Sequence, residues 1–209
     1  MISGGSAPAR RRSIRLLALW LAGAAASCIG LAAHAAEPGG WDLKQLMRDL
    51  GKVQTAKGRF VERKYLAILN APLEVSGTLL YVAPNRLEKH TLVPRAESLV
   101  LQADELTIET TQPNRRRKLQ LAQYPMIQVF VESIRSTLAG DLAALNRFYE
   151  VALSGDERSW RLLLKPSDPK MQELVSEIRI SGSGDWIHAI EFLEPGGDRS
   201  VMSITRDAR

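Results

Sequence analysis

Residues 149–180, YEVALSGDERSWRLLLKPSDPKMQELVSEIRI, contain three runs in which apolar residues occupy alternate positions. Ser154-Gly155-Asp156 separates the first two runs, and a turn with two prolines at 165–169 follows the second. Side chains of a β-strand point alternately to opposite faces, so each run predicts a strand with one apolar and one polar face. Such strands are typical of an antiparallel sheet that packs on one side only.

The same alternation recurs along most of the chain. It occurs at Leu99 and Leu101, at Leu106 and Ile108, and near Leu119, with Gly- or Pro-containing turns between the runs. Counted in this way, the sequence predicts six strands before residue 122 and five after residue 147. The fold class is therefore mainly β, with some α+β character.

Three helices are predicted beside these strands. Residues 42–53 show apolar positions at helical spacing after Asp42, a suitable N-cap. Residues 125–138 repeat the pattern after Pro125, Gly140 suits a left-handed C-cap, and Asp141 caps a short helix through Asn146. About eleven strands present more apolar surface than three helices can cover. Either the sheet closes on itself or helices close one mouth of it, and both arrangements favour an apolar pocket.

The first 35 residues predict a secretory signal peptide. Arginines at 10–15 precede the apolar run 16–26, and Ala33-His34-Ala35 fits a small-x-small cleavage site. We expect a mature domain of residues 36–209 in the periplasm. The alternatives are an uncleaved membrane anchor, a twin-arginine export signal, or a degenerate lipidation site at Cys28.

Charge and cysteine content narrow the functional classes. The chain is 45% apolar and 24% charged, as in an ordinary globular domain. Four of its 28 basic residues lie in the first 15 positions. The remaining 24 basic residues are nearly balanced in charge by 23 acidic residues, so nucleic-acid binding is not indicated. Cys28, the only cysteine, lies in the leader, so the mature domain has no disulfide or cysteine nucleophile.

Catalytic motifs are absent from the sequence. Only His90 and His188 remain after the leader, and there is no G-x-S-x-G elbow, P-loop or G-x-G-x-x-G motif. We predict no enzymatic activity, no cofactor and no metal site. The basic run Arg115, Arg116, Arg117 and Lys118 is either a solvated hairpin end or a docking patch for an acidic partner or an anionic lipid surface.

Several short motifs, in order, resemble the LolA outer-membrane lipoprotein carrier family. They are Asp42-Leu43-Lys44, Phe60-Val61-Glu62-Arg63, Gly77-Thr78-Leu79-Leu80-Tyr81 running into Pro84-Asn85, His90 followed by Pro94, Glu97-Ser98-Leu99-Val100, the apolar helix after Pro125, and Asp198-Arg199-Ser200. The resemblance covers nearly the whole mature chain and suggests a divergent subgroup.

The resemblance implies a half-open antiparallel β-barrel with a helical lid. Members of that family accept acylated lipoproteins from an inner-membrane transporter and deliver them to an outer-membrane acceptor. By matching positions, Leu87, His90, Met126 and Ile127 would contact the acyl chains. Periodicity adds Leu79, Tyr81, Leu99, Phe130 and Ile134, with ordinary core packing as the alternative for every one of these positions. We expect a monomer.

One position departs from the family pattern. Many family members have an arginine before the proline of an R-P-N segment, implicated in lid closure and transfer, whereas this chain has Ala83. The cargo could therefore be a free lipid, glycolipid or lipid-like pigment precursor. The other functions left open are an envelope sensor or regulatory interaction module and an envelope enzyme or maturation factor.

Overall fold

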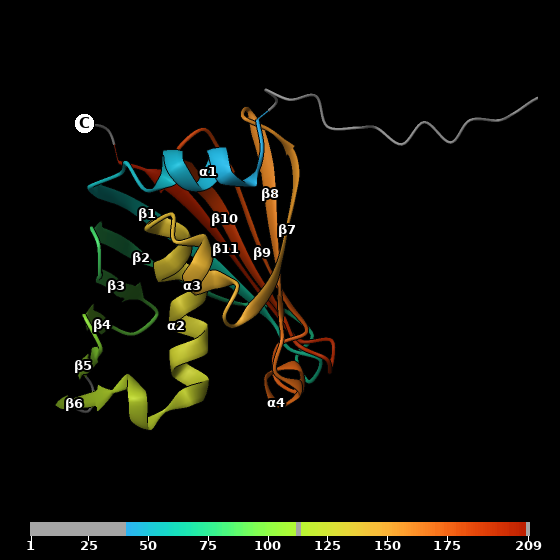
Figure 1. The fold of residues 1–209 in the computed structure, drawn as a ribbon. Coiled ribbons are helices and arrows are strands. Elements are labelled where there is room, and N and C mark those ends of the chain that lie inside the picture. The colour runs from blue at the N-terminus through green and yellow to red at the C-terminus, as the bar shows by residue number, and fades with distance from the viewer. Residues whose placement is uncertain (1–40, 112–113, 208–209) are drawn as a thin grey trace, which may run out of the picture. The chain divides into compact units, whose positions relative to one another are not determined.

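The structure, a computed structural model, describes residues 41–111 and 114–207, without the side chains of Asn114 and Met126. The predicted leader and the turn at 112–113 lie outside the described residues. Within them, one antiparallel sheet of 11 strands has the order β6-β5-β4-β3-β2-β1-β11-β10-β9-β8-β7. The edge strands β6 and β7 do not pair with each other, so the sheet is an unclosed barrel that curves around α2 (Figure 1).

The prediction of six strands before residue 122 and five after residue 147 is confirmed. The strands are β1 Thr55–Tyr65, β2 Leu73–Val82, β3 Arg86–Val93, β4 Glu97–Gln102, β5 Glu105–Thr111, β6 Asn114–Gln120, β7 Tyr149–Asp156, β8 Ser159–Pro166, β9 Glu177–Ser183, β10 Trp186–Leu193 and β11 Arg199–Arg206. The helices are α1 Leu43–Leu50, the 3-10 turn η1 Leu121–Gln123, α2 Pro125–Leu138, α3 Leu142–Leu145 and α4 Pro169–Gln172.

The ends of the helices follow the capping chemistry of the sequence. Asp42 accepts a hydrogen bond from the backbone N–H of Gln45 at 2.7 Å, and Asp141 accepts one from Ala144 at 2.9 Å. Gly140 has φ +67, as a left-handed cap requires. A Cβ at Gly140 would also lie 2.0 Å from the carbonyl oxygen of Met47, so this glycine lets α1 approach the end of α2.

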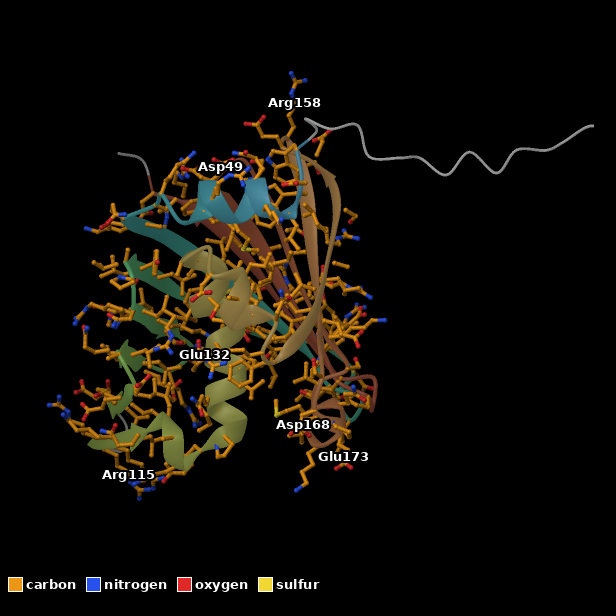
Figure 2. All side chains as sticks on the ribbon, in the orientation of Figure 1. Asp49, Arg115, Glu132, Arg158, Asp168 and Glu173 are labelled. Atoms are coloured by element: carbon orange, nitrogen blue, oxygen red, sulfur yellow. The ribbon has the colours of Figure 1, made fainter. Side chains whose placement is uncertain are left out.

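One face of the sheet, here called the inner face, carries the core. It includes Phe60, Leu101, Leu162, Ile180 and Ile190, all buried. Leu46, Met47 and Leu50 of α1 pack against the second half of this face, next to the buried Trp160 of β8. Figure 2 shows Asp49 on α1 and Asp168 beside α4 at opposite ends of the strands, so the apolar side of α1 covers one end of the inner face.

Two helical segments, η1 and α4, were not predicted. Residues 165–169 were interpreted as a turn, but Asp168 accepts a hydrogen bond from Lys170 N–H at 2.8 Å and Pro169 begins α4. Proline at the first helical position lacks only an N–H that would be unpaired anyway, so this turn could continue into a helix. Helix α1, by contrast, is shorter than predicted. It ends at Leu50, with Gly51 as its C-cap, three residues before the predicted limit at Val53.

Candidate functional site

An apolar cavity of about 560 Å³ lies between α2 and the inner face of the sheet. Sites that enclose one small organic ligand have volumes of roughly 300–1,000 Å³, so the cavity has the size of a ligand site. Apolar side chains of β2 to β5, β10 and β11 form its sheet side: Leu79, Tyr81, Leu87, Leu99, Leu101, Leu106, Ile108, Ile190, Phe192, Met202 and Ile204. They belong to the face that the period-two pattern marks as apolar.

Helix α2 forms the opposite wall. Its cavity-lining residues are Ile127, Phe130, Val131, Ile134 and Leu138, spaced as one stripe of an amphipathic helix. The ring of Phe130 stacks on that of Phe192 in β10, with centroids 4.3 Å apart. Phe130 is nevertheless 40% exposed, so this aromatic pair lies where the cavity opens to solvent.

Tyr149 connects α2 to the second half of the sheet. Its hydroxyl donates a hydrogen bond to the carbonyl oxygen of Val129 at 2.9 Å. Burial raises the pKa of Tyr149 to about 12, so the phenol stays protonated and remains a donor at neutral pH. The contact fixes one point of α2 relative to the first residue of β7.

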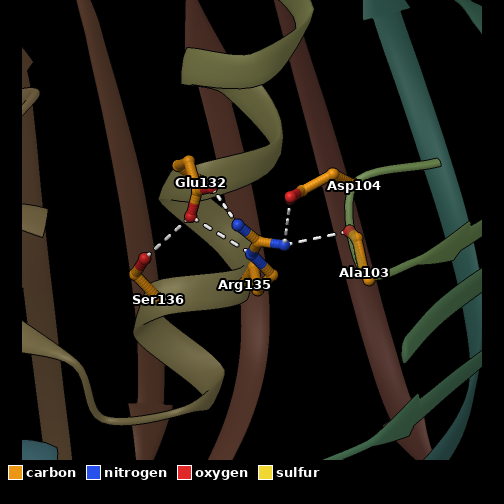
Figure 3. Close-up of polar contacts among 5 residues, drawn as sticks. All are labelled: Ala103, Asp104, Glu132, Arg135 and Ser136. Carbon is orange, nitrogen blue, oxygen red and sulfur yellow. Dashed lines mark hydrogen bonds and ion pairs between the residues drawn. The ribbon is translucent and has the colours of Figure 1, made fainter. Parts of the chain in front are cut away.

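Arg135 connects α2 to the first half of the sheet (Figure 3). Its guanidinium donates to the carbonyl oxygen of Ala103 at 3.0 Å and to Asp104 at 3.2 Å, both in the turn between β4 and β5. It also pairs with Glu132 one turn earlier on α2, which is buried and accepts a further hydrogen bond from Ser136 at 3.1 Å. Burial alone would lower the pKa of Arg135, but the Glu132 carboxylate outweighs it and raises that pKa.

A charged group interrupts the apolar lining at β1 and β3. Glu62 is buried, and its Oε2 lies 2.5 Å from the ammonium of Lys89. Ser200 donates to the other oxygen at 2.6 Å, and the Lys64 ammonium lies 3.7 Å from it. Burial would raise the pKa of Glu62, but Lys89 and the hydrogen bonds outweigh it, so the pKa lies below its usual value and Glu62 is ionised. We call Glu62, Lys64, Lys89 and Ser200 the Lys89 cluster.

Seven of the nine residues predicted to contact acyl chains lie on the wall of this cavity. They are Leu79, Tyr81, Leu87, Leu99, Ile127, Phe130 and Ile134. The side chain of Met126 is outside the described residues. Lining the cavity is compatible with a ligand site and with core packing, so the assignment of these residues to lipid binding stays a prediction.

His90 is placed elsewhere. Leu87 and His90 are three residues apart on β3, and strand alternation therefore puts them on opposite faces. The His90 ring lies 2.7 Å from Glu88, and this hydrogen bond holds the pKa of the Glu88 carboxyl below its usual value. Glu88 is among the residues that line the cavity, whereas His90 is not. The structure therefore places His90 outside the wall of this cavity, apart from Leu87.

The basic run on β6 is divided between the two faces of the sheet. Arg116 pairs with Glu109 at 3.0 Å and Lys118 pairs with Glu105 at 2.7 Å. Arg117 and Arg115 lie opposite Ile108 and Thr110 in the register, on the same face as the cavity. All four side chains are exposed, and Figure 2 shows Arg115 at the margin of the sheet. The four cations of the predicted docking patch thus form two pairs, with Arg115 and Arg117 on the cavity side of the sheet and Arg116 and Lys118 on the other side.

The sequence reasoning missed the Lys89 cluster. Glu62 is two residues from Phe60 on the same strand, so its side chain also points to the inner face. The signal in the sequence was a charged residue at a position where the alternation predicts an apolar one.

Among residues 41–111 and 114–207, no group of three or more potential ligands is placed to hold a metal ion. No helix in these two ranges has the length and hydropathy needed to cross a membrane.

Comparison with known proteins gives the family. The family model described as "Outer membrane lipoprotein carrier protein LolA-like" matches residues 35–207, which is most of the chain. The chain belongs to this family. A search of curated proteins found no match.

Three solved structures are similar to this LolA-like chain. A LolA superfamily protein from Nitrosomonas europaea is 10% identical, with a TM-score of 0.40 over 80% of this chain and 94% of that one. A putative outer membrane lipoprotein-sorting protein domain from Vibrio parahaemolyticus is 9% identical, with a TM-score of 0.43 over 81% and 92%. The MucA/MucB complex structure from Pseudomonas aeruginosa is 14% identical, with a TM-score of 0.47 over 80% of this chain but only 58% of that chain.

Proposed function

We propose that this LolA-like protein is a periplasmic carrier that encloses acyl chains of a lipoprotein or lipid and moves them from the inner to the outer membrane. The observation that carries the proposal is the cavity of about 560 Å³ between α2 and the sheet, whose wall is mainly aliphatic. The family membership supports the same function. Residues 1–35 would direct export, an inner-membrane transporter would be the donor, and an outer-membrane protein would be the acceptor.

Burial of hydrocarbon provides the binding energy in this proposal. Each buried CH₂ group contributes roughly 0.8 kcal/mol, so one long acyl chain supplies on the order of 10 kcal/mol before the costs of opening and ordering. Ile127, Phe130 and Ile134 of α2 and Leu79, Leu87 and Leu99 of the sheet would contact the chain. This protein needs no covalent chemistry to do so.

The lid would differ from that implied by the family resemblance. Ala83 stands where many members have an arginine, and an alanine side chain donates no hydrogen bond. Helix α2 is instead joined to the turn between β4 and β5 through Arg135. Lipoprotein and free lipid or glycolipid therefore both remain cargo candidates, and the experiment below separates them.

The test is native mass spectrometry of the protein purified from the cell envelope without detergent, followed by lipid extraction. A bound acyl-containing species supports the carrier and identifies its cargo. An apo mass, together with no uptake of added lipid or lipopeptide, would refute the carrier and favour a regulatory interaction role.

A pair of variants ties the binding to the cavity. Ile127→Asp places a carboxylate in the apolar wall and should abolish uptake of a fluorescent fatty acid. Gln128→Asp changes the next residue of α2, which does not line the cavity, and should leave uptake unchanged. Equal loss of folding and binding in Ile127→Asp, judged by thermal unfolding, would support the core-packing interpretation of Ile127.

A further inference from the structure

We propose that the Lys89 cluster is a head-group site, which makes the cavity selective for single-chain amphiphiles with an anionic head, a carboxylate or a phosphate. This inference rests on the proposed function, since it names the class of ligand that the same cavity takes. It depends on where the cluster lies on the inner face and on its uncompensated charge.

Lys89 reaches the cluster by crossing the sheet. It is on β3 and Glu62 is on β1, with β2 between them. Gly77 of β2 pairs with Phe60 in the register, and a Cβ at Gly77 would lie 1.9 Å from the carbonyl oxygen of His90, so this glycine lets the backbones of β2 and β3 approach closely there. The Lys89 ammonium lies 4.9 Å from the centre of the Phe60 ring and 2.5 Å from the Glu62 carboxylate.

The cluster has hydrogen-bonding capacity left on its cations and little on its anion. Both oxygens of Glu62 are engaged, by Lys89 on one side and by Ser200 and Lys64 on the other. An ammonium has three N–H donors, and the bond to Glu62 uses one donor of Lys89. The remaining donors are available to an acceptor that enters the cavity.

The charge of the cluster is also unbalanced. Two ammonium groups surround one carboxylate, which leaves a net charge of +1 on the cluster itself. The other charged residues that line the cavity are Lys57, Glu88, Asp185, Glu194 and Arg199. Of these, Glu88 pairs with Arg86 and Asp185 with Arg206, and the charges of Glu194 and Arg199 are opposite. Because charge in a low-dielectric site is costly unless it is paired, an anionic head would complement the cluster, whereas a cationic head would add repulsion.

The geometry gives the ligand a direction. Glu62 and Ala56 are six positions apart on β1, which corresponds to about 20 Å at the spacing of residues in a strand. Ala56 is in register with Tyr81, Leu87 lies opposite Tyr81, and all three line the cavity. An anionic head at Lys89 would therefore place the hydrocarbon tail along this apolar row, toward the end of the sheet that Leu50 of α1 covers.

A purely structural role for Lys89, as a brace between β3 and β1, makes a different prediction. A brace affects every ligand alike, through the stability of the cavity wall. A head-group site discriminates among ligands that share one tail and differ in head charge.

The experiment measures displacement of a neutral fluorescent probe from the protein purified from the cell envelope, at pH 8, by four ligands with the same sixteen-carbon chain. They are palmitate, palmitoyl lysophosphatidate, hexadecanol and hexadecylamine. We expect at least one of the two anions to bind tenfold or more tightly than the alcohol, and the amine to bind most weakly. Preference for palmitate or for lysophosphatidate then identifies the source of the anionic head.

The variants separate binding from folding. Lys89→Met should reduce the preference for the anion over the alcohol to within about twofold. Glu62→Gln/Lys64→Met/Lys89→Met removes all three charges of the cluster, leaves neither a carboxylate nor an ammonium unpaired there, and should show the same loss of preference in a folded protein. Lys118→Met is the matched control, because Lys118 also pairs with a glutamate but on the opposite face, and it should keep the wild-type preference.

Two outcomes overturn different claims. If the wild type binds the anions, the alcohol and the amine equally, or if Glu62→Gln/Lys64→Met/Lys89→Met keeps the anion preference, the head-group site is refuted and the acyl carrier remains. If none of the four ligands displaces the probe and none is taken up, the carrier function itself fails.

Discussion

Replacing Arg135 with methionine is expected to destabilise the protein by roughly 3–5 kcal/mol, the usual cost of leaving a buried charge without its partner. The charge in question is Glu132, which is 6% exposed and pairs with Arg135. Ser136 would remain as a hydrogen-bond donor to it, but a hydroxyl does not neutralise a carboxylate. The substitution also removes the hydrogen bond from Arg135 to the carbonyl of Ala103.

The contribution of the outer part of this contact should be small. Asp104 is 69% exposed, and ion pairs exposed to solvent typically contribute about 0–1 kcal/mol. Asp104→Asn should therefore change the free energy of unfolding by less than about 1 kcal/mol. Glu132→Gln/Arg135→Met leaves no unpaired buried charge, so it should recover most of the stability that Arg135→Met loses.

Urea denaturation of the wild type and the three variants gives these free energies, and hydrogen exchange of the α2 amides shows where the loss occurs. Faster exchange in α2 is expected for Arg135→Met before global unfolding changes the rest of the sheet. The reasoning fails if Asp104→Asn costs as much as Arg135→Met. It also fails if the double variant is no more stable than Arg135→Met alone.

Three further predictions concern the sheet and the ionisable groups. Folding lowers the pKa of Glu62, so near and below about pH 4.3 the unfolded chain binds more protons than the folded one. The stability that this group contributes is therefore present above that pH and is lost as the pH falls through the folded pKa. Denaturation curves between about pH 6 and pH 3 should therefore show a flatter loss of stability for Glu62→Gln than for the wild type, and an equal slope would contradict the assignment. A Cβ at Gly182 would lie 2.2 Å from the Trp160 ring, so Gly182→Ala should lower the melting temperature by several degrees, whereas Gly196→Ala, with open space around it, should not; similar shifts would refute the packing argument. Tyr149→Phe removes the hydroxyl that bonds to the backbone of α2 and should cost about 0.5–1.5 kcal/mol in urea denaturation, with no cost expected if the bond is not formed.

The strands and the helix caps could be predicted because their signals are local. Alternation at Tyr149, Val151 and Leu153 requires no knowledge of the partner strand, and Asp42 caps α1 with a backbone N–H three residues away. The one-turn helix α4 was missed because Asp168 and Pro169 are as common in turns as at helix starts. The local sequence does not distinguish between these two uses.

The Lys89 cluster could not be predicted because it depends on register. Lys89 and Glu62 are 27 residues apart and meet because the register of β3 on β2 and of β2 on β1 places both side chains on the inner face. A shift of one residue between two strands would move one of the partners to the other face. The position of His90 outside the cavity wall has the same origin, since a family pattern assigns a sequence position and the strand decides which face its side chain takes. The alternation along a strand therefore predicts which of its residues share a face, but it does not predict which residues of other strands they contact.

The same sheet geometry suggests how binding and release could be balanced in this protein. The wall that would hold an acyl chain is largely aliphatic and shared between the sheet and α2, so the chain would gain most of its burial only when α2 is in place. The described polar side-chain contacts between α2 and the sheet include Tyr149 at one side and Arg135 at the other. Both residues make hydrogen bonds to backbone carbonyls, and Arg135 also pairs with the exposed Asp104. Each of these contacts contributes a few kcal/mol at most, which is less than the roughly 10 kcal/mol that one buried acyl chain can supply. Movement of α2 would therefore break few polar contacts within the protein and would leave the eleven-stranded sheet folded, and the main cost of release would be the burial that the acyl chain loses.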